Sequence, residues 1–204
     1  IRDRSQRRGG SVGISLQKSQ SVSLAKEAPH GLTRISLGVG WDVAKKGLFG
    51  GLLGGGGDID LDASCITFDA DKAVLEQVWF GKLANAAGTI RHSGDNLTGE
   101  GDGDDESIAI ELDRLDPRVE HIVLTVNSFR GQTFAKVANA FGRVVDKKSG
   151  RELARFDISD AGPHTGLILA RLSRAGGQWD FKAVGERTEG RTVHDLTAPA
   201  RAIL

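Results

Sequence analysis

Twelve consecutive residues, Asp95 to Glu106, hold six carboxylates, one amide, one hydroxyl and three glycines, with no lysine or arginine among them. Like charges about 5 Å apart repel by roughly 3 kcal/mol at an effective dielectric near 20, so several such pairs oppose any compact conformation of this segment. A bound cation turns that repulsion into attraction. Oxygen ligands favour calcium or magnesium over zinc or copper, and a glycine-rich backbone can also turn its carbonyls inward. The segment therefore predicts a hard-cation site.

A second acidic segment has the spacing of a strand. Asp58, Asp60, Asp62 and Ser64 alternate with Ile59, Leu61, Ala63 and Cys65. A period of two places the first set on one face and the second set on the other, so one face can bind while the other packs. The segment does not fit an EF-hand, because Ala63 replaces the turn glycine and Asp69 stands where the bidentate glutamate belongs.

Composition bounds the class of protein. With 204 residues and 39% hydrophobic content the chain can form an ordinary core, and 28 glycines with only 4 prolines favour a β-rich fold. The net charge of zero hides a segregation: residues 58–106 hold twelve acids against three bases, and the remainder is basic. An acidic pole favours a cation, the basic remainder leaves room for an anionic partner, and no nucleic-acid partner is evident.

The single cysteine and the hydropathy pattern point to a cytoplasmic protein. Cys65 cannot form an intramolecular disulfide, and it lies on the strand face opposite the carboxylates, where a small buried hydrophobic residue is expected. The N-terminal region has no apolar run typical of a signal peptide, and no stretch approaches the roughly 20 apolar residues that span a bilayer.

Alternating apolar and polar residues predict the fold. Residues 1–12, which include four arginines, are expected to form a disordered basic arm or an expression remnant, and 13–204 a single domain. The glycine-rich stretch 47–57 is expected to be a flexible surface insertion, and 133–140 a short helix or an irregular turn. A helix is expected from an N-cap at Thr192.

About ten short strands are predicted, including 14–18, 22–26, 33–41, 58–68, 74–80, 107–112, 119–127, 141–146, 167–174 and 178–184. The expected fold is mainly β, an antiparallel sandwich with a short C-terminal helix.

Several of these segments together resemble the tellurium-resistance TerD family. They are Ile14-Ser15-Leu16, Val22-Ser23-Leu24, Leu37 to Asp42, Asp58 to Ser64, Trp179 to Gly185 and, above all, His92 to Glu106. The resemblance implies a calcium-binding β-sandwich that is associated with tellurite resistance and general stress responses and is not an established enzyme. The long glycine-rich insertion and the arginine-rich start depart from the family pattern.

Carried over to this chain, the resemblance implies a set of calcium ligands on the strand and the loop. They are Asp58, Asp60, Asp62, Asp95, Asn96, Glu100, Asp102, Gly103, Asp104, Asp105 and Glu106. One calcium takes 6 to 8 oxygens, so this supply is enough for two adjacent ions. The expected function is a non-catalytic calcium-binding stress-response module that acts with protein partners of a stress-response complex.

The sequence is also compatible with two alternative functions. One is a calcium-dependent adaptor that binds anionic lipid or protein, with peripheral contact to a membrane. The other is a metal-dependent phosphoesterase, in which His92, next to the acidic loop, is the candidate base.

Overall fold

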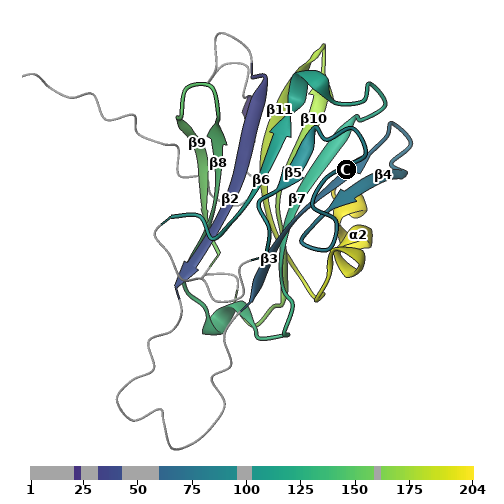
Figure 1. The fold of residues 1–204 in the computed structure, drawn as a ribbon. Helices are drawn as coiled ribbons and strands as arrows, with labels where there is room; N and C mark the ends of the chain where they lie inside the picture. The colour runs from purple at the N-terminus through teal and green to yellow at the C-terminus, as the bar shows by residue number, and fades with distance from the viewer. Residues whose placement is uncertain (1–20, 24–31, 43–59, 96–102, 159–161) are drawn as a thin grey trace, which may run out of the picture.

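Two antiparallel sheets packed face to face form the protein in the computed structural model, which describes residues 21–23, 32–42, 60–95, 103–158 and 162–204 (Figure 1). The larger sheet has the strand order β1-β11-β10-β7-β3-β4. Its strands are β1 (Ser21–Ser23), β11 (Gln178–Thr188), β10 (Gly166–Ala175), β7 (His121–Ser128), β3 (Leu61–Phe68) and β4 (Val74–Val78). The predicted central strand at 119–127 is β7, which lies between β10 and β3.

The smaller sheet has the order β5-β6-β2-β8-β9. Its strands are β5 (Ile90–His92), β6 (Glu106–Glu111), β2 (Arg34–Asp42), β8 (Ala138–Asp146) and β9 (Glu152–Asp157). Every pairing between the named strands is antiparallel. The predicted mainly-β antiparallel sandwich is therefore confirmed.

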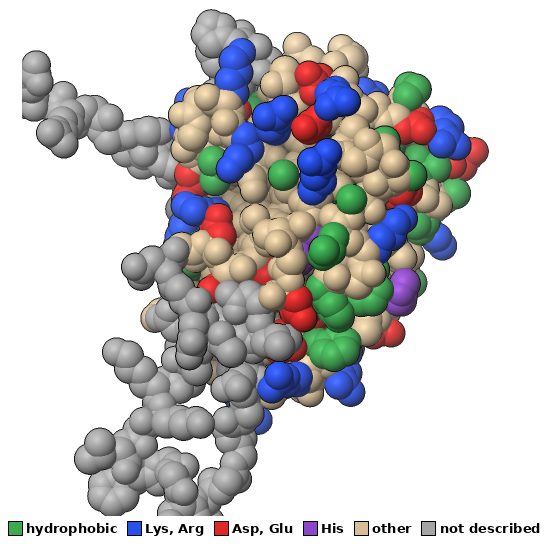
Figure 2. Space-filling view, in the orientation of Figure 1, with side chains coloured by type: hydrophobic (Ala, Val, Ile, Leu, Met, Phe, Trp, Pro, Cys, Tyr) green, Lys and Arg blue, Asp and Glu red, His purple; other side chains and the backbone are tan. Residues whose placement is uncertain are grey.

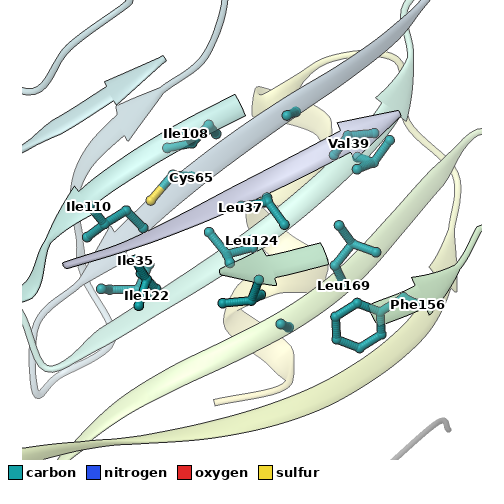
Figure 3. Packing of buried hydrophobic residues seen from close by; sticks show 14 of the residues in the cluster. Ile35, Leu37, Val39, Cys65, Ile108, Ile110, Ile122, Leu124, Phe156 and Leu169 are labelled. Atoms are coloured by element: carbon teal, nitrogen blue, oxygen red, sulfur yellow. The ribbon is translucent and has the colours of Figure 1, made fainter. Parts of the chain in front are cut away.

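The core lies between the two sheets, where the alternating apolar side chains of both meet (Figure 3). Ile35, Leu37 and Val39 of β2 are fully buried there, because period-two spacing points all three toward the larger sheet. From the other side, Leu124 of β7 and Cys65 of β3 point into the same space. The expected burial of Cys65 is confirmed, and this burial raises the pKa of its thiol.

Helix α2 (Val193–Ala202) covers the outer face of the larger sheet (Figure 1). Its start is the predicted N-cap, since the Thr192 hydroxyl accepts a hydrogen bond from the Asp195 N–H and the Asp195 side chain accepts one from the Thr192 N–H. Leu196 and Ala200 pack against Ile66 of β3 in a second apolar cluster. The strand β3 is thus covered on both faces.

The expected helix or turn at 133–140 has a different form. A 3-10 turn, η2 (Phe134–Lys136), is followed at once by β8, which begins at Ala138 and not at the predicted Phe141. A second 3-10 turn, η1 (Leu112–Arg114), follows β6. Within the described ranges, no helix is both long and apolar enough to cross a membrane. The predicted arm 1–12, strand 14–18 and insertion 47–57 lie outside the described residues.

Candidate metal centre

Three carboxylates from two distant parts of the chain converge at one end of the sandwich. Asp60 and Asp62 lie at the start of β3, and Asp95 lies just after β5. One oxygen from each carboxylate lies within 4.8 Å of the other two. Ligand oxygens that share a calcium ion at 2.3 to 2.6 Å are at most about 5 Å apart, so this spacing fits a common ion.

The start of β3 is positioned by the end of β7. The Phe129 N–H donates to the Asp60 carbonyl at 3.1 Å, and Asp62 is the register partner of Asn127. Because Leu61 and Ala63 point into the core, Asp62 points to the outer face of the larger sheet. The carboxylates are nevertheless enclosed, since Asp60 is 3% exposed and Asp62 is 2% exposed.

Burial and mutual repulsion disfavour the charged forms of both aspartates. Burial, followed by the nearby charge of Asp95, raises the pKa of Asp60 to about 6. Burial, followed by the charges of Glu106 and Asp60, raises the pKa of Asp62 to about 8. The metal-free arrangement is therefore electrostatically unfavourable near neutral pH, and a cation would relieve it.

Unpaired buried oxygens give an independent test of whether the site fits a cation. Asp60 Oδ1, Asp62 Oδ1 and Asn127 Oδ1 are all buried, and none receives a hydrogen bond from any described residue. Leaving a buried acceptor unpaired costs about 1–3 kcal/mol, so three of them together call for an unseen partner. Carboxylate and amide oxygens are the types of ligand that suit calcium.

Asn127 is a member of the site that sequence reasoning missed. Its amide nitrogen donates to Asp62 Oδ2 at 2.8 Å and to the Arg191 carbonyl at 2.7 Å. With both amide hydrogens engaged, the orientation of the amide and of the Asp62 carboxylate is defined. The available signal was the pair Thr125 and Asn127, two polar residues at period-two spacing after the apolar run Ile122 to Leu124.

Arg130 was also missed, and it provides positive charge at the site. Its Nε lies 3.6 Å from Asp60 Oδ2, and its side chain is 41% exposed. The Arg130 charge lowers the pKa of Asp60, against the larger raising effects of burial and Asp95. Without a metal ion, the Arg130 guanidinium offsets part of the negative charge of the site.

Glu106 and His92 seal the open edge of β3 beside the carboxylates. Strand β4 pairs β3 only from Cys65 to Phe68, so the edge at Ala63 is left free of a strand partner. Glu106, which is fully buried, accepts a hydrogen bond from the Ala63 N–H at 2.8 Å. His92 Nε2 lies 3.2 Å from the Ala63 carbonyl and 3.3 Å from Glu106 Oε2. Both side chains therefore connect the smaller sheet to the larger one.

The hydrogen bonds of His92 do not suit a general base. The Gly94 N–H donates to His92 Nδ1 at 3.0 Å, so the ring proton is assigned to Nε2, which faces the Ala63 carbonyl and Glu106. The ring is buried, and its one lone pair is already used. As arranged, His92 has no free nitrogen with which to accept a proton from a substrate.

The end of the acidic loop turns away from the three-carboxylate cluster. Asp104 forms a bidentate ion pair with Arg143 of β8, in which Arg143 Nε donates to Oδ1 at 2.7 Å and Nη2 donates to Oδ2 at 3.0 Å. Asp105 Oδ2 accepts a hydrogen bond from the Trp41 N–H at 2.9 Å, which ties the loop to β2. Gly103 lies over β2 with a φ of 107°, a conformation that favours glycine.

The structure thus brings together Asp60, Asp62 and Asp95, with Glu106 adjoining. Four of the residues implied as ligands lie outside the described residues, namely Asp58, Asn96, Glu100 and Asp102.

Comparison with known proteins identifies the family. The TerD domain family model matches residues 12–198, a span that includes both acidic segments. The chain belongs to the TerD family. A TerD relative, tellurium resistance protein TerZ of Serratia marcescens, is 52% identical over 184 residues, which cover 90% of this chain and 94% of the relative. Stress response protein SCP2 of Bacillus subtilis (strain 168) is 40% identical and covers 91% of this chain and 98% of its own length.

A solved TerD-type structure has the same fold. It is a homologue of telluride resistance protein (TerD) from Streptomyces coelicolor A3(2), with a TM-score of 0.68 and 26% sequence identity. The match covers 82% of this chain and 96% of the solved one. The sandwich of this chain is therefore shared with a solved relative at 26% sequence identity.

Proposed function

We propose that this TerD-family chain is a calcium-binding, non-catalytic protein of the cytoplasmic stress response, associated with tellurite resistance. In this proposal Asp60, Asp62 and Asp95 hold the ion, and the amide oxygen of Asn127 adds a neutral ligand. The bound ion neutralises the acidic end of the sandwich and stabilises the attachment of β3 to the segment that follows β5.

The observation that carries the proposal is the set of buried oxygens without donors. Asp60 Oδ1 and Asp62 Oδ1 are enclosed and unpaired, and burial raises the pKa of both of these carboxyls. The ligands are oxygens alone, without the softer ligands that zinc and copper prefer, so the site suits calcium. The names of the relatives, which refer to tellurium resistance and stress response, support the biological setting.

Two features support a non-catalytic role. His92, the candidate base of the alternative phosphoesterase, has its lone pair engaged by the Gly94 N–H. Cys65, the only thiol in the chain, is buried in the core, where its pKa is raised and no second cysteine can resolve an oxidised form. A lone buried thiol is also consistent with a reducing compartment.

The number of ions depends on residues beyond the three-carboxylate cluster. The described carboxylates support one ion between Asp60, Asp62 and Asp95. A second ion would need further ligands from the acidic residues Asp58, Glu100 and Asp102. Titration calorimetry with calcium reports the stoichiometry directly.

Thermal unfolding with and without calcium tests the proposal. Calcium at roughly a hundredfold excess over Kd should stabilise the protein by about 2.7 kcal/mol, which raises the melting temperature by about 5–10 °C for a domain of this size. The double variant Asp60→Asn with Asp62→Asn should lose this rise. In chelator alone it should melt at or above the wild-type temperature, because it lacks two buried carboxyls whose charged forms are disfavoured by burial.

Asp104→Asn is the matched control. Asp104 belongs to the same acidic loop, but its carboxylate is paired with Arg143. This variant should keep the full calcium-dependent rise. A wild-type melting temperature that is the same in excess calcium and in chelator would remove the proposal, as would an equal loss of the rise in Asp104→Asn and in the double variant.

A further inference from the structure

Two exposed hydrophobic tips lie beside the candidate metal centre. Among the described residues, the large hydrophobic side chains that are exposed are Leu83 and Phe129, at 48% and 39%. Leu83 follows a turn closed by reciprocal backbone hydrogen bonds between Trp79 and Lys82, and Phe129 lies in a turn closed by the Gly131 N–H and the Ser128 carbonyl. We refer to residues 79–83 and 128–131 as the turn pair.

Aromatic contacts hold the turn pair together. The ring of Phe80 meets the ring of Phe129 edge to face, with centroids 5.4 Å apart, and Trp79 meets Phe80 in the same way at 4.7 Å. Because packed rings join the two turns, both exposed tips are held in place before any partner arrives.

The turn pair is directly continuous with the candidate metal centre. The Phe129 N–H donates to the Asp60 carbonyl, and the Leu83 carbonyl accepts a hydrogen bond from the His92 N–H at 2.8 Å. The space-filling view shows hydrophobic side chains bordered by acidic ones in the lower half of the described surface, with basic side chains nearby (Figure 2). An apolar surface therefore adjoins a place where charge would change on ion binding.

Each hydrophobic tip also has a cation next to it in the sequence. Lys82 precedes Leu83 and is 49% exposed, and Arg130 follows Phe129. Lys82 pairs with Glu76 at 3.1 Å, and Arg130 lies 3.6 Å from Asp60. A calcium ion at Asp60 would compete with Arg130 for the same carboxylate, so ion binding both neutralises the acidic cluster and frees the Arg130 guanidinium.

We propose that the turn pair is a calcium-dependent docking surface for an anionic phospholipid membrane. The inference rests on the proposed calcium site. Without the ion, the exposed carboxylate of Asp95 repels a negatively charged membrane. With the ion, that repulsion is removed, Arg130 and Lys82 face the headgroups, and Phe129 and Leu83 enter the apolar layer beneath them.

The small size of the surface favours a membrane over a protein partner. A stable protein interface takes about 20–30 residues a side. A membrane needs only a few inserted side chains if basic residues and a neutralised acidic site accompany them. The turn pair provides two hydrophobic tips and two cations, and it adjoins an acidic cluster whose charge calcium would neutralise.

Vesicle cosedimentation tests the inference. The full chain is mixed with vesicles of phosphatidylcholine and phosphatidylserine in roughly a 3:1 ratio, or of phosphatidylcholine alone, in calcium or in chelator. Binding should be at least about tenfold stronger with phosphatidylserine and calcium together than in any other combination. Phe129→Ser and Leu83→Ser should each weaken it about tenfold, with calcium binding by calorimetry retained.

Arg114→Gln is the matched charge control for Arg130→Gln. Arg114 is an exposed arginine that pairs with Glu111, at the opposite end of β6 from Glu106. Vesicle binding should fall in Arg130→Gln and stay at the wild-type level in Arg114→Gln.

The possible failures are distinguishable. Calcium binding without vesicle binding would overturn the docking surface and leave the proposed function intact. Equal binding to phosphatidylcholine alone, or full binding by both serine variants, would also overturn it. Absence of calcium binding in calorimetry would remove the proposed function, and this inference with it.

Discussion

A single amide orients the most deeply placed carboxylate of the site. Asn127 donates to Asp62 Oδ2 and to the Arg191 carbonyl, so it also joins the site to the segment just before helix α2. A hydrogen bond to a charged group contributes about 1.5–3 kcal/mol, and the partners that orient metal ligands commonly govern metal affinity.

Replacement of this amide should therefore affect both stability and calcium binding. We expect Asn127→Ala to destabilise the protein by about 2–3 kcal/mol and to weaken calcium binding about tenfold or more, measured by denaturant unfolding and by calorimetry. Asn85→Ala is the control, because the Asn85 amide also donates a hydrogen bond, but to the Thr89 hydroxyl and not to a carboxylate of the site. Wild-type calcium affinity in Asn127→Ala would contradict the assigned role.

Two glycines of β2 allow the end of the acidic loop to lie directly on the smaller sheet. A Cβ at Gly38 would lie 2.2 Å from the Asp104 carboxylate, and a Cβ at Gly40 would lie 2.5 Å from the Gly103 carbonyl oxygen and 2.6 Å from the Phe141 ring. Gly38 and Gly40 face outward, since the alternating residues of β2 point into the core. The Gly-x-Gly spacing in the TerD-like segment 37–42 thus has a packing reason.

The glycine at position 40 should be intolerant of even one added carbon. We expect Gly40→Ala to cost about 1–3 kcal/mol, because a backbone oxygen blocks the new methyl group and cannot move by a change of rotamer. Gly142→Ala on β8 is the comparison, since its nearest neighbour is the flexible Leu169 side chain at 3.2 Å, and it should cost less. Equal unfolding free energies for the two variants would exclude this explanation.

The two sheets are joined beside the candidate metal centre by side chains as well as by core packing. Glu106 and His92 come from the smaller sheet, and both reach the Ala63 backbone of the larger one. Glu106 also adds to the repulsion that raises the pKa of Asp62. Charge in the site and attachment of the sheets are therefore coupled, so an ion bound there should stabilise the whole sandwich and not only a loop.

This coupling gives stability a characteristic pH dependence. Folding raises the pKa of Asp60 to about 6 and that of Asp62 to about 8, from an ordinary value of 3.8. A carboxyl with a raised pKa favours the folded state while protonated, so its contribution is complete below about pH 4 and is lost as the pH rises through the folded pKa. These groups should make the metal-free protein less stable as pH rises from about 5 to 8.

The difference between wild type and Asp62→Asn isolates the Asp62 contribution. In metal-free buffer, the advantage of the variant in melting temperature should grow as pH rises over that range. With saturating calcium the order should reverse, because deprotonated carboxylates are the ligands and calcium affinity rises with pH. A difference between the two proteins that does not change with pH in metal-free buffer would contradict the assigned pKa of Asp62.

Local periodicity was enough to predict the class of fold. Alternation in 33–41, 107–112 and 119–127 identified strands that the structure contains, and the Thr192 cap identified the start of α2. The alternation around Asp60 and Asp62 also separated the carboxylates from Cys65. Such signals are readable because side-chain direction in a strand repeats every two residues whatever the strand pairs with.

Only the tertiary structure decided which residues meet. The partnership of Asp62 with Asn127, the approach of Arg130 to Asp60 and the sealing of the Ala63 edge by Glu106 depend on strand order and register. These come from contacts between segments far apart in the chain, and a register shift of one residue would turn each side chain to the opposite face. Composition showed that an acidic pole exists, whereas the packing of β3 against β7 and β6 selected the carboxylates that are enclosed together.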